Sequence, residues 1–215
     1  MCFSAEASFG ASVILFAIGA LSISKATTIP QKILASIPII FGVQQFAEGI
    51  LWLSLSHSSL AYWDKLATYA FLIFAQVVWP IIVPLSVMLL EKNKHNLKIL
   101  KGLFALGILV GSYLTYCLLF YKVNASISCS HILYDQDFPT FIKHSGIFYL
   151  IATVVPPIVS SIKRLRLLGI IILVSYLITQ FFYKDYLVSV WCFFAAIISV
   201  VVLSVIIRLN RNAAS

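Results

Sequence analysis

The chain has 215 residues, of which 61% are hydrophobic and 10% are charged, and its formal net charge is +8. Soluble domains carry about a quarter charged residues, so this composition excludes an ordinary soluble protein and predicts an integral membrane protein. A nucleic-acid partner is excluded as well, because the basic residues fall in short connections where membrane orientation and anionic lipid account for them.

Apolar stretches long enough to cross a bilayer as helices recur along the whole chain. We predict seven transmembrane helices, near residues 8–24, 36–56, 66–90, 99–121, 146–162, 165–183 and 186–207. They use up most of the chain, so we expect an all-α bundle that forms a single domain over residues 1–215. The stretch before the first span lacks Lys and Arg, which disfavours a cleaved signal peptide.

Charged residues alternate between the two ends of the predicted spans. Most basic residues follow the first, third and fifth spans or lie in the tail: Lys25, Lys32, Lys92, Lys94, Lys98, Lys101, Lys163, Arg164, Arg166, Arg208 and Arg211. Most acidic residues lie at the opposite end: Glu6, Asp64, Asp135, Asp137 and Asp185. The positive-inside rule therefore predicts an outside N-terminus and a cytoplasmic C-terminus.

One face of the second predicted span is polar. It carries residues spaced three and four apart, namely Phe41, Gln44, Gln45, Glu48 and Trp52, while Ile39, Ile40, Val43, Ala47 and Ile50 fall on the opposite face. We expect the polar face to point into the bundle. Glu48 would lie about 12 Å below the outer boundary. No Lys or Arg occurs in a span core to pair with it, so we expect Glu48 to be protonated or bound to a cation.

Two interpretations of Glu48 stay open. A neutral Glu48 could hydrogen-bond its neighbours and hold helices together. Alternatively it could belong to a ligand site, since ionisable groups within a membrane are commonly functional. Polar and tyrosine side chains on other spans favour the second interpretation and complete the predicted ligand-binding set: Glu48, Gln44, Gln45, Gln76, Trp52, Tyr69 and Gln180.

Helix-breaking and small residues occur within several spans. Pro80 and Pro84 in the third span, like the Pro156–Pro157 pair in the fifth, free backbone carbonyls that a ligand, a hydroxyl side chain or water could satisfy. Gly107 and Gly111 form a GxxxG pattern in the fourth span, which indicates close helix packing.

The longest outer connection and the N-terminus contain cysteine and histidine residues. In an oxidising compartment Cys2 could form a disulfide with Cys129. Alternatively Cys2, Cys129, His131 and His57 are candidate ligands of zinc or copper. No recognised metal-ligand spacing is present, so unrelated side chains are the third interpretation.

Four segments carry a family resemblance: "MCFSAEASF", "FGVQQFAEGILWL", "WPIIVPLSVMLLE" and "SVWCFFAA". The chain resembles a family of uncharacterised bacterial multi-pass membrane proteins that begin Met-Cys-Phe-Ser-Ala and contain a QQxxEGxxW segment. The resemblance implies the bacterial cytoplasmic (inner) membrane and no assigned activity or cofactor. By position it implies that these residues belong to the family pattern: Cys2, Gln44, Gln45, Glu48, Gly49, Trp52, Trp79, Pro80, His131, Trp191 and Cys192. Cys129 does not match the pattern, which weakens the disulfide interpretation.

Three functions remain. The favoured one is an outward-facing polar pocket around Glu48 that binds or transports a small solute, a proton or a cation, within a lipid bilayer. The second is an intramembrane enzyme, metal-dependent or not, with Glu48 as acid or base and His131 near the pocket mouth. The third is a structural or interaction protein without a ligand, which predicts a fully packed interior. The sequence specifies no cofactor and no oligomeric state.

Overall fold

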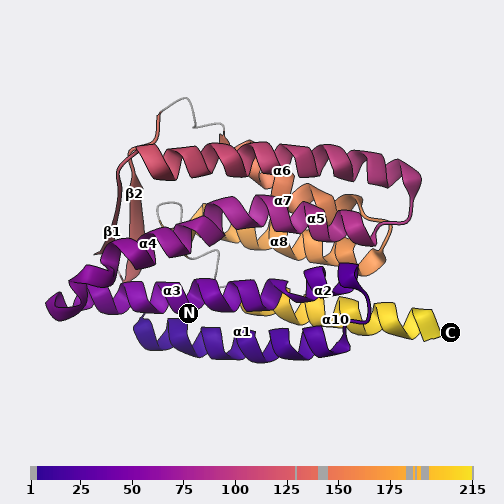
Figure 1. The fold of residues 1–215 in the computed structure, drawn as a ribbon, viewed down its shortest axis with the longest axis horizontal. Helices are drawn as coiled ribbons and strands as arrows, with labels where there is room; N and C mark the ends of the chain where they lie inside the picture. Colours follow the sequence, from indigo (N-terminus) through magenta and orange to yellow (C-terminus); the bar gives the residue numbers. More distant parts are fainter. Residues whose placement is uncertain are drawn as a thin grey trace.

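The computed structural model describes residues 4–128, 130–139, 145–182, 186, 188–189 and 194–214. Within this part, long helices lie side by side along one axis (Figure 1). Five helical segments are long and apolar enough to cross a membrane, namely Ala5–Lys25, Ile29–Ser56, Ser58–Leu90, Lys94–Phe120 and Lys163–Phe182, and Gly146–Val159 and Ala195–Asn210 are shorter apolar helices. The prediction of a helical, membrane-compatible protein is confirmed to this extent.

Helices α1 (Ala5–Lys25) and α3 (Ile37–Ser56) pack tightly against each other. The Ser12 hydroxyl donates to the Gly42 carbonyl at 2.8 Å, and a Cβ at Gly19 would lie 2.4 Å from Ile39. In the sequence, the short helix α2 (Ile29–Ala35) lies between α1 and α3, and the span prediction omitted it. Thr28 and Gln31 cap its N-terminus through reciprocal hydrogen bonds, so this helix begins before the predicted span.

The third predicted span is a series of helical segments. A 3₁₀ helix (η1, Ser58–Trp63) leads into α4 (Asp64–Leu72), a π-helical stretch (η2, Ile73–Val78) and α5 (Trp79–Leu90). Pro80 has no N–H, so the carbonyl of Ala75, which in the π-helical pattern would accept from residue 80, lacks its helical partner. The Tyr149 hydroxyl supplies the missing donor, 2.6 Å from the Ala75 carbonyl oxygen.

Helix α6 (Lys94–Phe120) packs on α5 through the predicted GxxxG pattern. A Cβ at Gly107 would lie 1.8 Å from the Pro80 carbonyl oxygen, and one at Gly111 would lie 2.9 Å from Ile81. Pro84 has no N–H to donate to that Pro80 carbonyl, so the backbone of α6 approaches an oxygen that lacks its helical partner. The two glycines are therefore packing positions, as predicted.

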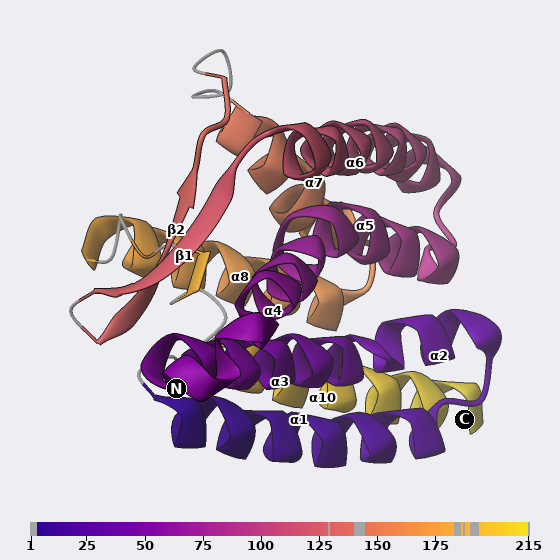
Figure 2. The ribbon, with the colours of Figure 1, turned by 60° about the vertical axis from the view of Figure 1, so that its left-hand side comes forward.

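The long connection between α6 and the next helix forms a β-hairpin, which the all-α prediction missed. Strand β1 (Val123–Ser128) pairs antiparallel with β2 (His131–Gln136), in a register that places Val123 opposite Gln136. The hairpin crosses one end of the helices (Figure 2). Ile132 is fully buried and packs in one cluster with Leu51 and Ala67, so the hairpin belongs to the packed structure.

The remaining helices complete the bundle around an apolar core. Helix α7 (Ser145–Val159) contains Pro156 and Pro157, and it is followed by α8 (Lys163–Phe182) and α10 (Ala195–Ala214). The start of the last predicted span, 186–207, falls largely outside the described residues. The main core cluster joins α2, α5, α7, α8 and α10, with Leu34, Val87, Leu165 and Val202 almost inaccessible to solvent.

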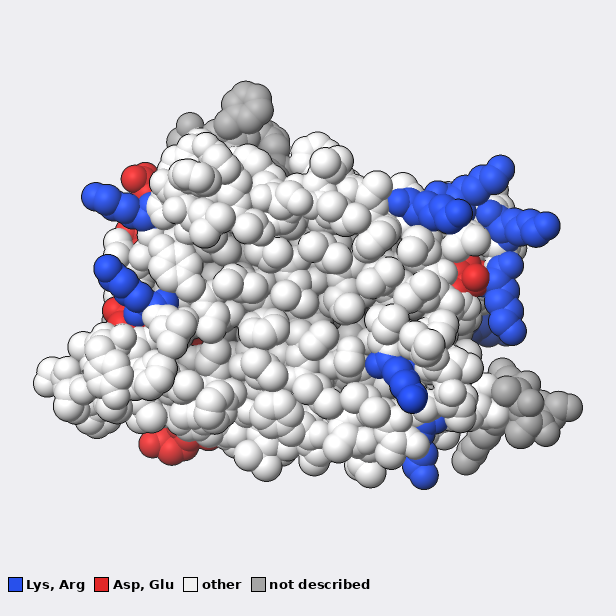
Figure 3. All heavy atoms as spheres, viewed as in Figure 1, with Lys and Arg blue, Asp and Glu red and all other residues white. Residues whose placement is uncertain are grey.

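Charged side chains gather at the two ends of the molecule. In Figure 3, Lys and Arg concentrate at the end where α5 meets α6, and Asp and Glu lie mainly at the end with the hairpin. Large apolar side chains are exposed along the sides of the helices, among them Val13, Leu109, Leu119 and Phe181. An exposed apolar belt of this size is typical of a surface that contacts lipid.

Candidate functional site

Glu48 lies in a closed polar cluster inside the bundle. We use the name Glu48 cluster for Gln45, Glu48 and Ser189, each of which is at most 1% exposed. The two carboxylate oxygens of Glu48 accept hydrogen bonds from the Ser189 hydroxyl at 2.6 Å and from the Gln45 amide nitrogen at 3.0 Å. The prediction that this face of α3 points inward is confirmed. Ala47, predicted on the opposite face, is also buried, because it packs against Phe71 and Leu72 of α4.

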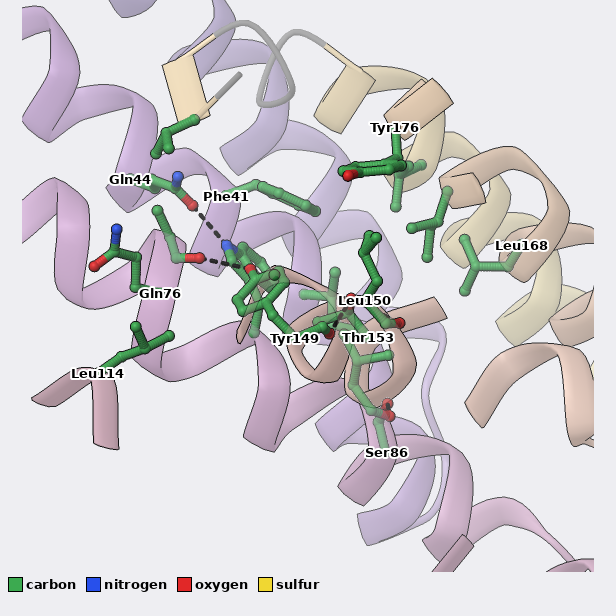
Figure 4. Close-up of a pocket in the computed structure, with 18 of the residues that line it drawn as sticks. Phe41, Gln44, Gln76, Ser86, Leu114, Tyr149, Leu150, Thr153, Leu168 and Tyr176 are labelled. Atoms are coloured by element: carbon green, nitrogen blue, oxygen red, sulfur yellow. Dashed lines mark hydrogen bonds between the residues drawn. The ribbon is translucent and has the colours of Figure 1, made fainter. Parts of the chain in front are cut away.

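A cavity of about 500 Å³ lies beside this cluster, between α3, α5, α7 and α8. Gln44 and Gln76 lie on one side of it and Tyr176 and Leu168 on the other (Figure 4). The described residues that line it include no Asp, Glu, Lys, Arg or His. A volume of this size is within the range of small-molecule sites, roughly 300–1,000 Å³.

Polar side chains gather in the part of the cavity toward the hairpin, whereas the part toward the basic end is mostly apolar. Its polar lining comprises Gln44, Gln76, Gln136, Tyr149, Tyr176 and Gln180, with Thr153 and Ser86 further in. Apolar residues line both parts, among them Leu114, Phe138, Ile147 and Val188 toward the hairpin and Val83, Val87, Leu150, Leu168, Ile172, Ile198 and Val202 further in.

Hydrogen bonds fix several of the polar lining residues. The Trp79 indole nitrogen donates to the Gln44 amide oxygen at 2.8 Å, and the Trp79 ring stacks on Phe41 with ring centroids 4.0 Å apart. The Tyr176 hydroxyl donates to the Gln180 amide oxygen at 3.2 Å. These contacts hold the polar side chains of the cavity in place, and none of the described residues that make them is charged.

Gln76 and Gln136 differ from the other polar residues of the cavity. The Gln76 amide nitrogen donates to the Gln136 amide oxygen at 2.9 Å. The other two amide atoms, Gln76 Oε1 and Gln136 Nε2, are buried and have no hydrogen-bond partner among the described residues. We call these two residues the glutamine pair.

The seven predicted ligand-binding residues fall into two groups. Gln44, Gln76 and Gln180 line the cavity. The described lining does not include Glu48, Gln45, Trp52 or Tyr69, and Trp52 instead packs against Leu51 and Ala67. The cavity is therefore not centred on Glu48. The same face of α3 carries Gln44, which lines the cavity, and the Glu48 cluster, which does not. Whether any of the seven binds a ligand stays a prediction.

The candidate metal ligands are not brought together in the described part of the chain. His131 stacks on Tyr186 with ring centroids 4.7 Å apart, and His57 is exposed at the end of α3. Among the described residues, no group of three or more His, Cys, Asp or Glu side chains could hold a metal ion. Cys2 and Cys129 lie outside the described residues, so the disulfide and metal interpretations stay predictions.

A second buried carboxylate, Glu91, was not singled out in the sequence. It lies at the end of α5 and is 7% exposed. It accepts hydrogen bonds from the backbone N–H groups of Lys92, Asn93 and Ser161 and from the hydroxyls of Ser160 and Ser161. Burial raises the pKa of Glu91, but the hydrogen bonds from Ser161, Asn93 and Ser160 outweigh burial and hold it below the usual value of 4.5. Glu91 thus ties α5 to the connection between α7 and α8.

Comparison with known proteins identifies the family of the chain. A family model described as "Family of unknown function (DUF6629)" matches residues 1–215. The chain therefore belongs to this family, which confirms the expected membership of an uncharacterised family. No curated protein and no solved structure matches the chain.

Proposed function

We propose that this member of the DUF6629 family is an integral membrane protein that binds a small, uncharged, amphiphilic molecule in the cavity between α3, α5, α7 and α8. The proposal includes seven spans in a single domain, with the N-terminus outside and the C-terminus in the cytoplasm of a bacterial inner membrane. The basic end in Figure 3 supports this orientation by the positive-inside rule.

The observation that carries the proposal is that the described lining of the 500 Å³ cavity is uncharged, with most of its polar side chains toward the hairpin. An ion in such a cavity would lose its hydration without meeting an opposite charge, which is costly. A neutral molecule with an apolar tail would bury that tail against Val87, Leu150 and Leu168 and gain free energy in proportion to the area removed from water.

This proposal changes the role expected of Glu48. Its carboxylate accepts hydrogen bonds within the Glu48 cluster and does not figure in the described cavity lining. The geometry therefore favours Glu48 as a link between α3 and Ser189 over Glu48 as a proton or cation acceptor. A purely structural protein is less well supported, because it predicts a fully packed interior.

Photoaffinity labelling tests the proposal. The purified protein is incubated with decanol that carries a diazirine in mid-chain, and labelled residues are located by peptide mass spectrometry. We expect labels on cavity residues such as Leu150 and Leu168 and competition by unlabelled decanol. The variant Val83→Phe, which fills part of the cavity, should reduce this labelling severalfold.

The control is Leu109→Phe on the surface of α6, where the side chain is 68% exposed. This variant should label like the wild type. Labels confined to exposed residues such as Leu109 and Phe181, unaffected by unlabelled decanol and by Val83→Phe, would contradict the proposed function.

A further inference from the structure

The glutamine pair is the one polar part of the described cavity lining in which both a hydrogen-bond donor and an acceptor are left over. We propose, resting on the proposed function, that Gln76 and Gln136 recognise the head of the bound molecule. The head is then an uncharged group that donates one hydrogen bond and accepts another, namely a hydroxyl or a carboxamide.

The unused atoms of the pair carry this inference. Gln76 Oε1 can accept a hydrogen bond and Gln136 Nε2 can donate one, and both atoms are buried without a partner in the described part of the chain. Buried amide atoms without partners cost free energy. A ligand that supplies both partners removes this cost, whereas an alkyl tail placed against the pair does not.

The inference does not depend on how the two amides are oriented. Oxygen and nitrogen of a glutamine amide are assigned from hydrogen bonding, so both side chains could be flipped. If both are flipped, Gln136 donates to Gln76, and the pair still offers one free acceptor and one free donor. The requirement on the ligand is unchanged.

Two irregular features of the fold bring the pair together. Gln76 lies in the π-helical stretch before Pro80, a type of distortion that is frequent at functional sites. Gln136 is the last residue of β2, and it is separated from Gln76 by 60 positions in the sequence. Phe138, which follows the strand, also lines the cavity. The hairpin thus contributes both a polar and an apolar residue to the polar end.

The surroundings of the pair exclude charged heads. A carboxylate would have no proton to give to the free acceptor, and an ammonium group would meet the free donor of Gln136. Neither ion would find an opposite charge in the described lining. A hydroxyl both donates and accepts through its single oxygen.

A competition series on the wild-type protein tests the head group. Decanol, decanamide, decyl methyl ether and decane compete with the diazirine probe for the cavity. The ether accepts but does not donate, and the alkane does neither. We expect decanol and decanamide to compete about tenfold better than the ether, which corresponds to one hydrogen bond, and decane to compete least.

Matched variants test the residues. Gln76→Met and Gln136→Met should bring decanol and the ether to equal potency, because methionine has a similar length without the amide. Gln45→Met in the Glu48 cluster is the control and should keep the tenfold preference. Loss of the preference in that control alone would overturn the assignment to the glutamine pair.

The outcomes for the inference and for the proposed function are distinguishable. If all the competitors, decane included, displace the probe equally, the cavity binds apolar chains and the head-group inference is overturned. If none of the competitors displaces the probe, the proposed function itself fails.

Discussion

The Glu48 cluster and the glutamine pair are both polar regions of an apolar bundle, and among the described residues each has unused amide atoms: Gln45 Oε1 in the cluster, and an acceptor together with a donor in the pair. They differ in their relation to the cavity, which only the pair lines. Both carboxylate oxygens of Glu48 have protein donors. The glutamine pair has a free donor and a free acceptor and lines a cavity. The difference teaches that an ionisable residue in a membrane helix is not by itself the best guide to a ligand site. Under the proposed function, unused hydrogen-bonding groups beside a cavity are the better guide.

The largest effect is expected from Gly107→Ala, which changes the helix that carries one cavity wall. The added Cβ would lie 1.8 Å from the Pro80 carbonyl oxygen, so α5 must move away from α6. We expect a loss of about 2 kcal/mol of stability and weaker probe labelling. Unfolding in detergent measures the first and photolabelling the second.

The control for this change is Gly102→Ala on the same helix, where a Cβ would meet nothing within 4 Å. It should stabilise slightly, because alanine favours helix more than glycine by up to about 1 kcal/mol. Equal destabilisation by the two substitutions would show that the close approach of α6 to Pro80 does not matter.

An intermediate effect is expected in the Glu48 cluster. Glu48→Ala leaves the donors of Gln45 and Ser189 without their acceptor, and it should cost about 1–2 kcal/mol. Glu48→Gln should cost less than about 0.5 kcal/mol, because its amide oxygen still accepts from Ser189 and Gln45 can turn its oxygen toward the new amide. Unfolding in detergent is the measurement.

Probe labelling should be unchanged in Glu48→Gln, as it should be in Val43→Ala, a control on the exposed side of α3. If Glu48→Gln unfolds normally but no longer labels, the distinction between the closed cluster and the cavity breaks down. Glu48 would then have to be counted as a binding residue.

A smaller effect than in Glu48→Ala is expected at Glu91, the buried carboxylate at the end of α5. Because its pKa in the folded protein is held below 4.5, its hydrogen bonds contribute stability above that pH, and the contribution is lost as the pH falls through the folded pKa. Glu91→Gln should cost about 1 kcal/mol at pH 7, with the difference from the wild type shrinking below pH 4.5.

Thermal unfolding at a series of pH values measures this difference. Asp135→Asn is the control, because that carboxylate is exposed on the hairpin and surface substitutions change stability little. A difference between wild type and Glu91→Gln that is constant with pH would contradict a buried, ionised Glu91. A confirmed result would sharpen the comparison, since Glu91 would be a structural carboxylate like Glu48.

Hydropathy predicted the helices well because a span must satisfy its own backbone hydrogen bonds, so its length and apolarity are local properties. The hairpin was missed because the pairing of β1 with β2 depends on a partner strand and on a turn at Ser130, which has a φ of 60°. With the hairpin, Gln136 was missed as well. The periodicity of α3 predicted that Glu48 is buried, but it carried no information about what Glu48 contacts.

The sequence by itself determined a helical, membrane-compatible bundle, its two charged ends and the inward face of α3, because each follows from composition and period within one segment. Only the tertiary structure decided which polar residues face a cavity. One of the donors to Glu48 comes from Ser189, 141 positions away, and the partner of Gln76 comes from a strand 60 positions away. Hydrogen bonding between distant segments depends on packing, and the local pattern of either segment does not contain it.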